Sequence, residues 1–279
     1  MKDTDYEDNI NAVFIRTSHG VPRNRPPVCE QRLPQNMSPG INISSTRERA
    51  GAAAAAAAVH LAAQAIAERG RFVVAFSGGS LVELIAPGLI EHSRNGQIDW
   101  SAWHVLWADE RCVPPTSPDS NYALANEHLF RHVPLPEGRV YVLEAERGAD
   151  GAARAYEQYL REFLAPAPGQ APRFDLILLG MGEDGHTASL FPGHPLLDET
   201  KRWAAPVFDS PKPPPERVTL TLPVINNARH IVFVTAGAGK AEALAEVLGA
   251  DAPGNGLPAR RVSPCAGTLQ WYIDAAASA

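Results

Sequence analysis

A short apolar run at residues 174–179 that leads straight into a glycine-rich turn is the strongest constraint on the fold of this chain. The run reads FDLILL, which is typical of a strand buried on both faces in the middle of a parallel sheet. Gly180, Gly182 and Gly185 follow at once, and apolar residues resume only at Leu190. Three glycines in six residues indicate a backbone that turns tightly and stays close to something else.

His186 is the titratable side chain that this turn delivers. In open α/β sheets, ligands bind beyond the carboxyl ends of the strands, which is where the turn is expected. A histidine at that place is a candidate functional residue. The alternative interpretation is that residues 180–185 only form a turn, with Asp184 capping the next segment. We favour the functional interpretation.

Composition narrows the class of protein. The 279 residues, 45% hydrophobic and 20% charged, indicate a soluble globular chain with one large α/β domain or two small ones. The net charge of -6 argues against nucleic acid and anionic membranes as partners, so an anionic ligand must be met by a few local cations. No CxxC pair occurs, which predicts no metal site. A polar, acidic N-terminus and the lack of a membrane-length apolar run predict a cytoplasmic protein.

Residues 1–40 differ from the rest of the chain. Acidic and basic residues are nearly balanced there, and five prolines lie among them. Such a composition buries too little apolar surface to offset the entropy of ordering. We therefore expect a flexible N-terminal tail over residues 1–40 and a single folded domain over residues 41–279.

Three further predicted strands end in polar or glycine-rich motifs. Residues 72–76 precede SGGS, residues 103–108 precede DER, and residues 231–235 precede the GAGK that starts a helix. Backbone N–H groups in a glycine turn and the positive end of a helix dipole favour an anion such as phosphate. Taken alone, SGGS fits a plain tight turn equally well, and the lysine of GAGK fits surface decoration. These three motifs and the glycine-rich turn at residues 180–185 all follow predicted strands. We therefore expect the four segments to lie side by side along the carboxyl edge of one sheet.

The alternation of strands and helices after residue 41 predicts one doubly wound domain, with a mostly parallel, Rossmann-like sheet flanked by helices. A capping box at Ser45 to Glu48 predicts the start of the first helix, and Gly70 its end. Further helices are predicted over residues 81–92, 152–164 and 241–248, and another opens at residues 119–122 with Leu124 and Leu129 on its apolar face. Further strands are predicted at 140–143, 203–208, 217–222 and 271–273, the last of them at an edge.

In this order the motifs resemble those of the 6-phosphogluconolactonases, within a wider group that includes the glucosamine-6-phosphate deaminases. The similarity covers about residues 41–274 and includes SPKPPPERVTLTLPVINNAR and the terminal WYID. The resemblance implies hydrolysis of 6-phospho-D-glucono-1,5-lactone, a small sugar-phosphate lactone, without a metal or an organic cofactor. It also implies catalysis by His186 and a phosphate pocket made by Ser77, Gly78, Gly79, Ser80, Arg217 and Lys240.

The residues agree with that chemistry. A neutral His186 would take a proton from water attacking the lactone carbonyl and return it to the leaving ring oxygen. Either Asp184 or Asp109 would orient the imidazole. Arg111 and Asp109 would hold sugar hydroxyls or stabilise the oxyanion, and the sequence leaves their division of labour open. No G-x-S-x-G elbow occurs, so the serines are expected to bind substrate rather than attack it.

Two other functions remain as alternatives. An amino-sugar-phosphate isomerase would use the same pocket, but those relatives resemble D-E-Y and G-H-I-A-F-N-E-P where this chain has DER and GHTASLFP. A non-catalytic sugar-phosphate sensor would need an output module, and the tail is too short and too evenly charged to bind DNA. The sequence does not fix the oligomeric state, although we expect a monomer.

Overall fold

The computed structural model describes residues 39–249 and 256–279. The expected tail lies outside the described residues except for its last two positions. Six parallel strands form the main sheet, in the order β1-β9-β8-β5-β2-β3. Their bounds are β1 Gly40–Ser44, β2 Phe72–Phe76, β3 Trp103–Trp107, β5 Leu176–Leu179, β8 His230–Thr235 and β9 Thr268–Asp274. This sheet confirms the predicted α/β class.

A second, antiparallel sheet was not predicted. It has three strands in the order β4-β7-β6, namely β4 Asp109–Arg111, β7 Arg217–Leu220 and β6 Ala204–Val207. The DER motif, expected as a loop at a strand tip, is itself β4. Ala108 joins the two sheets, because its N–H donates to Phe76 of β2 while its carbonyl accepts from Leu220 of β7. The motif is thereby held on both sides.

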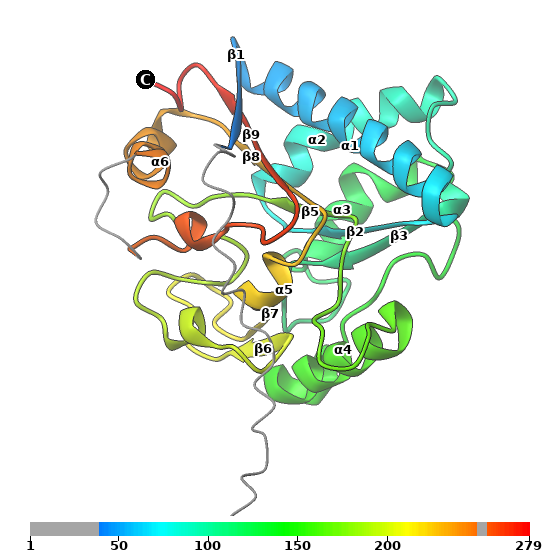
Figure 1. Cartoon of the computed structure of the whole chain (residues 1–279), viewed down its shortest axis with the longest axis vertical. Helices are drawn as coiled ribbons and strands as arrows, with labels where there is room; N and C mark the ends of the chain where they lie inside the picture. The colour runs from blue at the N-terminus through cyan, green and yellow to red at the C-terminus, as the bar shows by residue number, and fades with distance from the viewer. Residues whose placement is uncertain (1–38, 250–255) are drawn as a thin grey trace, which may run out of the picture.

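Helices cover both faces of the main sheet (Figure 1). The α-helices of the described residues are α1 Arg47–Arg69, α2 Ser80–Arg94, α3 Asn121–His128, α4 Gly148–Leu164, α5 Leu222–Ile225 and α6 Ala241–Leu248. Short 3-10 turns span Trp100–Ala102, Phe130–His132, Ala145–Arg147, Pro195–Asp198, Ala238–Lys240 and Pro258–Arg261. Alternate residues of β2 face opposite cores: Phe72 packs in the core beneath α1 and α2, and Val73 in the core on the side of α4. This is the three-layer arrangement of a doubly wound domain.

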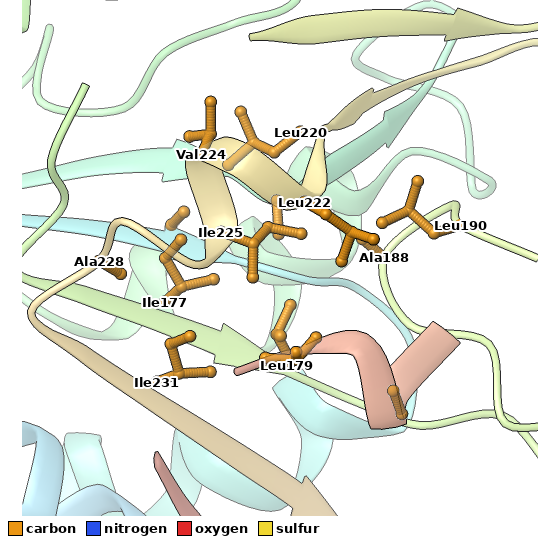
Figure 2. Packing of buried hydrophobic residues seen from close by; sticks show 14 of the residues in the cluster. Ile177, Leu179, Ala188, Leu190, Leu220, Leu222, Val224, Ile225, Ala228 and Ile231 are labelled. Carbon is orange, nitrogen blue, oxygen red and sulfur yellow. The ribbon is translucent and has the colours of Figure 1, made fainter. Parts of the chain in front are cut away.

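The core on the α4 side supports the turn after β5. Figure 2 shows Ile177 and Leu179 of β5 and Ile231 of β8 directed toward α5, with Ala188 and Leu190 beside them. All five are buried. Residues 188–190, which follow the glycine-rich turn, are therefore anchored in apolar core rather than on the surface.

Three strand or cap predictions were wrong in detail. Residues 140–143 form no strand, and only a single bridge joins Val140 to Val105. β9 lies inside the sheet, and the edge next to it is β1, whose Ile41 and Ile43 are exposed and give little apolar signal. The first helix is capped by Thr46, whose side chain accepts from the Arg49 N–H, and not by Ser45.

α1 also corrects the statement that no apolar run reaches membrane length. Its 23 residues include an 18-residue window of mean hydropathy 1.5, which is long and apolar enough to cross a membrane by composition alone. In the fold, α1 packs along α2 and against β9. Its buried side consists mainly of alanines, which permit that close approach.

Candidate active site

The four strand-end motifs do meet at one edge. β8, β5, β2 and β3 are consecutive, parallel neighbours in the sheet, so their carboxyl ends point the same way. The segments 236–240, 180–186, 77–80 and 109–111 follow these four strands. The topology thus places them side by side, as the sequence predicted, at the edge where open α/β sheets bind ligands.

The glycine-rich turn presents His186. The Gly182 N–H donates to the His186 carbonyl at 2.9 Å, and Gly185 adopts a φ of +73°, which disfavours any residue with a side chain. A Cβ built on Gly182 would lie 2.0 Å from His186 Nδ1 and 2.4 Å from Asp184 Oδ1. The absence of a side chain at Gly182 therefore makes room for the histidine and the aspartate together.

Asp184 orients the imidazole. Its Oδ1 lies 2.5 Å from His186 Nδ1, and since a carboxylate can only accept, Nδ1 carries the proton. The second ring nitrogen, Nε2, is then the unprotonated one and is able to accept a proton. The sequence left the orienting residue open between Asp184 and Asp109, and the geometry assigns it to Asp184.

Burial keeps His186 neutral. It lowers the pKa of the imidazole below its ordinary value, while Asp184 raises that pKa in part and Lys212 lowers it again. Burial raises the pKa of Asp184, but the hydrogen bond from His186 and the positive charge of Lys212 act against it, and the pKa of Asp184 is lowered as well. A neutral imidazole beside an ionised carboxylate is the arrangement that a general base requires.

Lys212 is a site residue that the sequence reasoning missed. Its Nζ lies 3.5 Å from Asp184 Oδ1 and 3.4 Å from His186 Nδ1. Because Nδ1 is a donor here, the ammonium group pairs with the carboxylate. Lys212 lies in the proline-rich segment 210–215, and the one signal there is a lysine placed between two prolines.

Arg217 holds that loop in place. Its guanidinium, which is buried, donates to the carbonyls of Lys212 at 2.7 Å and Pro214 at 3.0 Å, and to Ser189 Oγ at 3.3 Å. The predicted phosphate-binding role of Arg217 thus competes with contacts inside the protein. Substrate binding by Arg217 stays a prediction.

Asp109 and Arg111 lie on β4, at the floor of the site. Asp109 is buried, and its Oδ2 accepts from Ser189 Oγ at 2.7 Å, so it fixes the segment after His186. Arg111 donates through Nη1 to the Asp119 carbonyl at 2.7 Å, while its buried Nε has no hydrogen-bond partner among the described residues. Asp109 also acts on the pKa of both His186 and Arg217, which places these groups close together.

The part of the site where the phosphate is expected contains buried polar atoms without a hydrogen-bond partner in the described structure. Ser77 Oγ, Asn121 Oδ1 and Thr235 Oγ1 are buried without a hydrogen-bond partner in the described part of the chain. No side chain caps the N-terminus of α2, where Gly79 has a φ of +66°. A Cβ on Gly78 would lie 1.8 Å from Asn121 Oδ1, so glycine is needed there for packing. Free N–H groups and hydroxyls at a helix start suit an anion.

Lys240 ends the turn after β8 and stands at the start of α6. Burial lowers the pKa of its ammonium group, Glu183 and Asp184 raise that pKa, and Lys212 lowers it. Lys240 thus lies within electrostatic range of the His186 turn. The structure brings it to the same site as Asp184 and Lys212, as the strand order predicted.

Two polar groups near the site have structural roles. Glu110 is buried and accepts from the backbone N–H groups of Arg111, Asn121 and Tyr122 and from Ser120 Oγ, so it ties β4 to the start of α3. His194 contacts Asp209 at 3.1 Å and accepts from the Leu196 N–H. These contacts hold the turn that contains His194.

Comparison with known proteins places the chain in a family. The family profile described as "Glucosamine-6-phosphate isomerases/6-phosphogluconolactonase" matches residues 45–271. A rice protein named "Probable 6-phosphogluconolactonase 3, chloroplastic" is 44% identical over 222 residues, which are 77% of this chain and 67% of that protein. The human protein named "6-phosphogluconolactonase" is 43% identical over 246 residues, which are 86% of this chain and 93% of its own length.

A solved structure of the Trypanosoma brucei 6-phosphogluconolactonase matches with a TM-score of 0.76 at 29% identity, and the match covers 86% of this chain and 97% of that one. A monomeric glucosamine-6-phosphate deaminase structure, at 21% identity and a TM-score of 0.68, shares the fold. The relatives with 43–44% sequence identity are proteins named 6-phosphogluconolactonase, whereas the deaminase is 21% identical. The chain is therefore an enzyme of the glucosamine-6-phosphate isomerase/6-phosphogluconolactonase family, and it belongs to the lactonase branch.

Proposed function

We propose that this enzyme hydrolyses 6-phospho-D-glucono-1,5-lactone to 6-phospho-D-gluconate, with His186 as the general base. The observation that carries the proposal is the His186–Asp184 pair, in which the carboxylate holds Nδ1 at 2.5 Å and leaves Nε2 as the acceptor. The lowered pKa of His186 supports it, because the imidazole is then neutral near pH 7. The names of the relatives support the substrate.

In the proposed reaction, a water molecule attacks the lactone carbonyl carbon, C1. Nε2 of His186 takes one proton from that water as the C1–O bond forms, and the carbonyl oxygen becomes an oxyanion. When the tetrahedral intermediate collapses, the bond from C1 to the ring oxygen breaks, and the imidazolium returns the proton to that oxygen. Base assistance of this kind is worth roughly 10²–10⁴-fold in rate.

In this proposal, Asp184 and the nearby cations stabilise the charges that form during the reaction and bind the substrate. Asp184 stabilises the imidazolium that forms during attack, as the carboxylate of a triad does. Lys212 and Arg111 are the charges placed to stabilise the oxyanion or hold sugar hydroxyls. The phosphate binds at residues 77–80 and Lys240, and fixing it there positions C1 against the water.

The test is hydrolysis of the lactone generated in situ, followed by formation of 6-phosphogluconate against the spontaneous rate. We expect the wild-type enzyme to accelerate the reaction. His186→Asn should lower kcat by about 10²-fold or more while remaining folded. Asn keeps a polar side chain near Asp184 but cannot act as a base, so the comparison isolates proton transfer.

Absence of acceleration by the wild type would refute the lactonase assignment, and amino-sugar phosphates would be tested next. Acceleration with an unaffected His186→Asn variant would keep the activity and reject the base. Normal ligand binding by His186→Ala with full function retained would favour a sugar-phosphate sensor instead. These three outcomes separate the reaction from its mechanism.

We further propose that the enzyme acts in the cytoplasm, as a monomer whose partner is the small-molecule substrate. The absence of nucleic-acid and membrane partners is part of the same proposal, and it rests on the net charge of -6. Fractionation of the source cells and light scattering of the purified protein test these statements. A stable dimer in solution would overturn the monomer.

A further inference from the structure

A second group of cations lies at the edge of the main sheet opposite the candidate active site. Arg71 and Arg229 stand directly before β2 and β8, and Arg173 stands three residues before β5. These three strands are neighbours in the sheet. Their amino ends therefore bring the three arginines together, far from the carboxyl ends that carry His186.

This amino edge opens into a cavity of about 1280 Å³. That volume is larger than the roughly 300–1000 Å³ of an ordinary small-molecule pocket. Seven cations and three carboxylates line it among the described residues: Arg69, Arg71, Arg161, Arg173, Lys201, Arg229 and Arg261, against Asp175, Asp198 and Glu199. A smaller cavity of 420 Å³ adjoins it and shares Arg69, Arg173 and Arg229. The excess of cations is local, because the whole chain carries a net charge of -6.

Each of the three carboxylates already has ion-pair or hydrogen-bond partners within the protein. Asp175 pairs with Arg69 at 3.1 Å and Arg229 at 3.3 Å, and also accepts from the Val73 N–H at 2.9 Å. Asp198 pairs with Arg261 at 2.8 Å. The third carboxylate, Glu199, accepts from the N–H groups that follow it and pairs with Arg202, which does not line the cavity.

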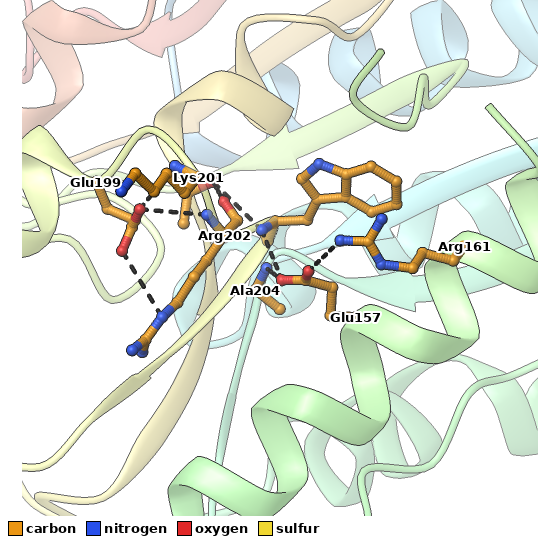
Figure 3. Close-up of polar contacts among 8 residues, drawn as sticks. Glu157, Arg161, Glu199, Lys201, Arg202 and Ala204 are labelled. Atoms are coloured by element: carbon orange, nitrogen blue, oxygen red, sulfur yellow. Dashed lines mark hydrogen bonds and ion pairs between the residues drawn. The ribbon is translucent and has the colours of Figure 1, made fainter. Parts of the chain in front are cut away.

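Three cations remain without a carboxylate in the described structure: Arg71, Arg173 and Lys201. Arg71 lies over the Phe163 ring at 5.0 Å, and Arg173 donates to the Ala266 carbonyl at 2.7 Å. Arg161 is not one of them, since it pairs with Glu157 at 2.5 Å, a contact drawn in Figure 3. Burial lowers the pKa of Arg173, Arg229 and Arg69 lower it further, and Asp175 offsets these effects only in part. An added anion would relieve this repulsion.

We propose that this cavity is a second, non-catalytic site, which binds a small organic phosphate carrying more than one anionic group. Guanidinium groups match phosphate oxygens in geometry and are the usual partners of buried phosphates. More than one anionic group is needed because Arg71 and Arg173 enter from the sheet edge, whereas Lys201 enters from the segment before β6. A ligand that neutralises both walls must span the cavity.

Calorimetric titration of the full-length protein with pyrophosphate, at low salt and without divalent metal, tests the site. We expect saturable binding, tighter for pyrophosphate and ATP than for inorganic phosphate. Arg173→Gln should weaken pyrophosphate binding about tenfold or more, because one charge-assisted contact is lost. The matched control is Arg131→Gln, which removes an exposed arginine that lines neither cavity. It should bind as the wild type does.

The two sites are distinguished by Lys240→Ala, which alters the candidate active site only. Unchanged pyrophosphate affinity in Lys240→Ala, together with the loss in Arg173→Gln, supports the amino-edge site. Loss in Lys240→Ala alone, equal loss in Arg131→Gln, or no saturable binding to the wild type would overturn it. If Arg173→Gln does not fold, Arg71→Gln replaces it, since that side chain only rests on the Phe163 ring. The same weakening is then expected.

Discussion

At His186, burial and the Asp184 carboxylate act on the imidazole pKa in opposite directions, and burial is the larger effect. The neutral form therefore persists to lower pH than for an ordinary histidine. Its proton is fixed on Nδ1 by a carboxylate two residues away, so the turn alone sets both the tautomer and the orientation of the ring. The proposed base and its aspartate come from one local stretch of sequence, which is why the sequence could predict them.

The pH dependence of kcat/KM follows from these signs. In the wild type, kcat/KM should fall as the pH drops through the pKa of His186, which lies below its ordinary value. Asp184→Asn removes the group that raises this pKa, so the acid limb should move to still lower pH. The plateau should fall about 10- to 10³-fold, because the tautomer is no longer held. Initial rates across the pH range measure both effects.

The matched control is Asp209→Asn, which removes the negative charge beside His194. Asp209 and His194 form a second histidine–aspartate pair, next to the loop at residues 210–215. We expect the pH profile of Asp209→Asn to match that of the wild type. An acid limb that stays in place in Asp184→Asn would contradict the assignment of His186 as the titrating base.

Gly182 offers a steric test of the same pair. Gly182→Ala would place a Cβ 2.0 Å from Nδ1 and 2.4 Å from Asp184 Oδ1, so it should lower kcat by about tenfold or more by displacing the ring. Gly180→Ala is the control, because its Cβ would meet only Leu81 Cβ, at an ordinary 3.8 Å. Steady-state kinetics and circular dichroism of both variants separate loss of geometry from loss of fold. Equal activities would show that Gly182 is not needed for spacing.

Lys240 tests the phosphate side. Lys240→Ala should raise KM more than it lowers kcat, because the phosphate is bound in both the ground state and the transition state. Substrate-saturation curves for the variant and the wild type measure the split. An unchanged KM would place Lys240 outside the site.

Among the elements, the buried strands β2, β3, β5 and β8 were predictable because each is a short apolar run that a glycine-rich or charged segment ends. Their carboxyl-edge motifs followed from that, and so did most of the candidate site. The position of β9 was not predictable, since its two neighbours, β1 and β8, lie at opposite ends of the described chain. Lys212 was missed for a similar reason. Arg217 holds the loop of Lys212 and also donates to Ser189, 28 positions away in the sequence, and no local pattern records that contact.

The contact between α1 and α2 gives a prediction at this scale. A Cβ on Gly51 would lie 2.0 Å from the Leu84 carbonyl oxygen, so Gly51→Ala should lower the free energy of unfolding by about 1–3 kcal/mol or more through overpacking. Helix propensity alone predicts the opposite sign, a gain of about 0.5–1 kcal/mol. Urea denaturation decides between the two effects.

The control for that measurement is Gly151→Ala in α4. A Cβ there would lie 2.8 Å from the Cβ of Arg147, an exposed residue just before the helix, so the strain is smaller and we expect a smaller loss of stability than in Gly51→Ala. If Gly51→Ala proved as stable as Gly151→Ala, the α1–α2 contact would be looser than the structure has it.

Over the whole molecule, the two proposed anion-binding edges lie at opposite ends of the same strands. Arg173→Gln should leave kcat/KM for the lactone within about twofold of the wild type. In the double variant, the effects of Arg173→Gln and Lys240→Ala on the free energy of activation from kcat/KM should add, because sites with no shared partner behave independently. Kinetics of the two single variants and the double variant test this. Strong non-additivity would mean that the edges communicate through β5 and β8.

The place of β9 also matters while the chain is being made. β9, near the end of the sequence, pairs with β8 on one side and β1 on the other, and the Ala275 N–H that follows it donates to the Ser44 carbonyl. Until β9 has been synthesised, β1 has no partner among the described strands, β8 has an open edge, and the part of α1 that packs on β9 is uncovered. The nascent chain thus exposes an unpaired strand edge and an apolar helix at the same time, and chaperones that recognise such surfaces have their opportunity to bind before β9 emerges from the ribosome.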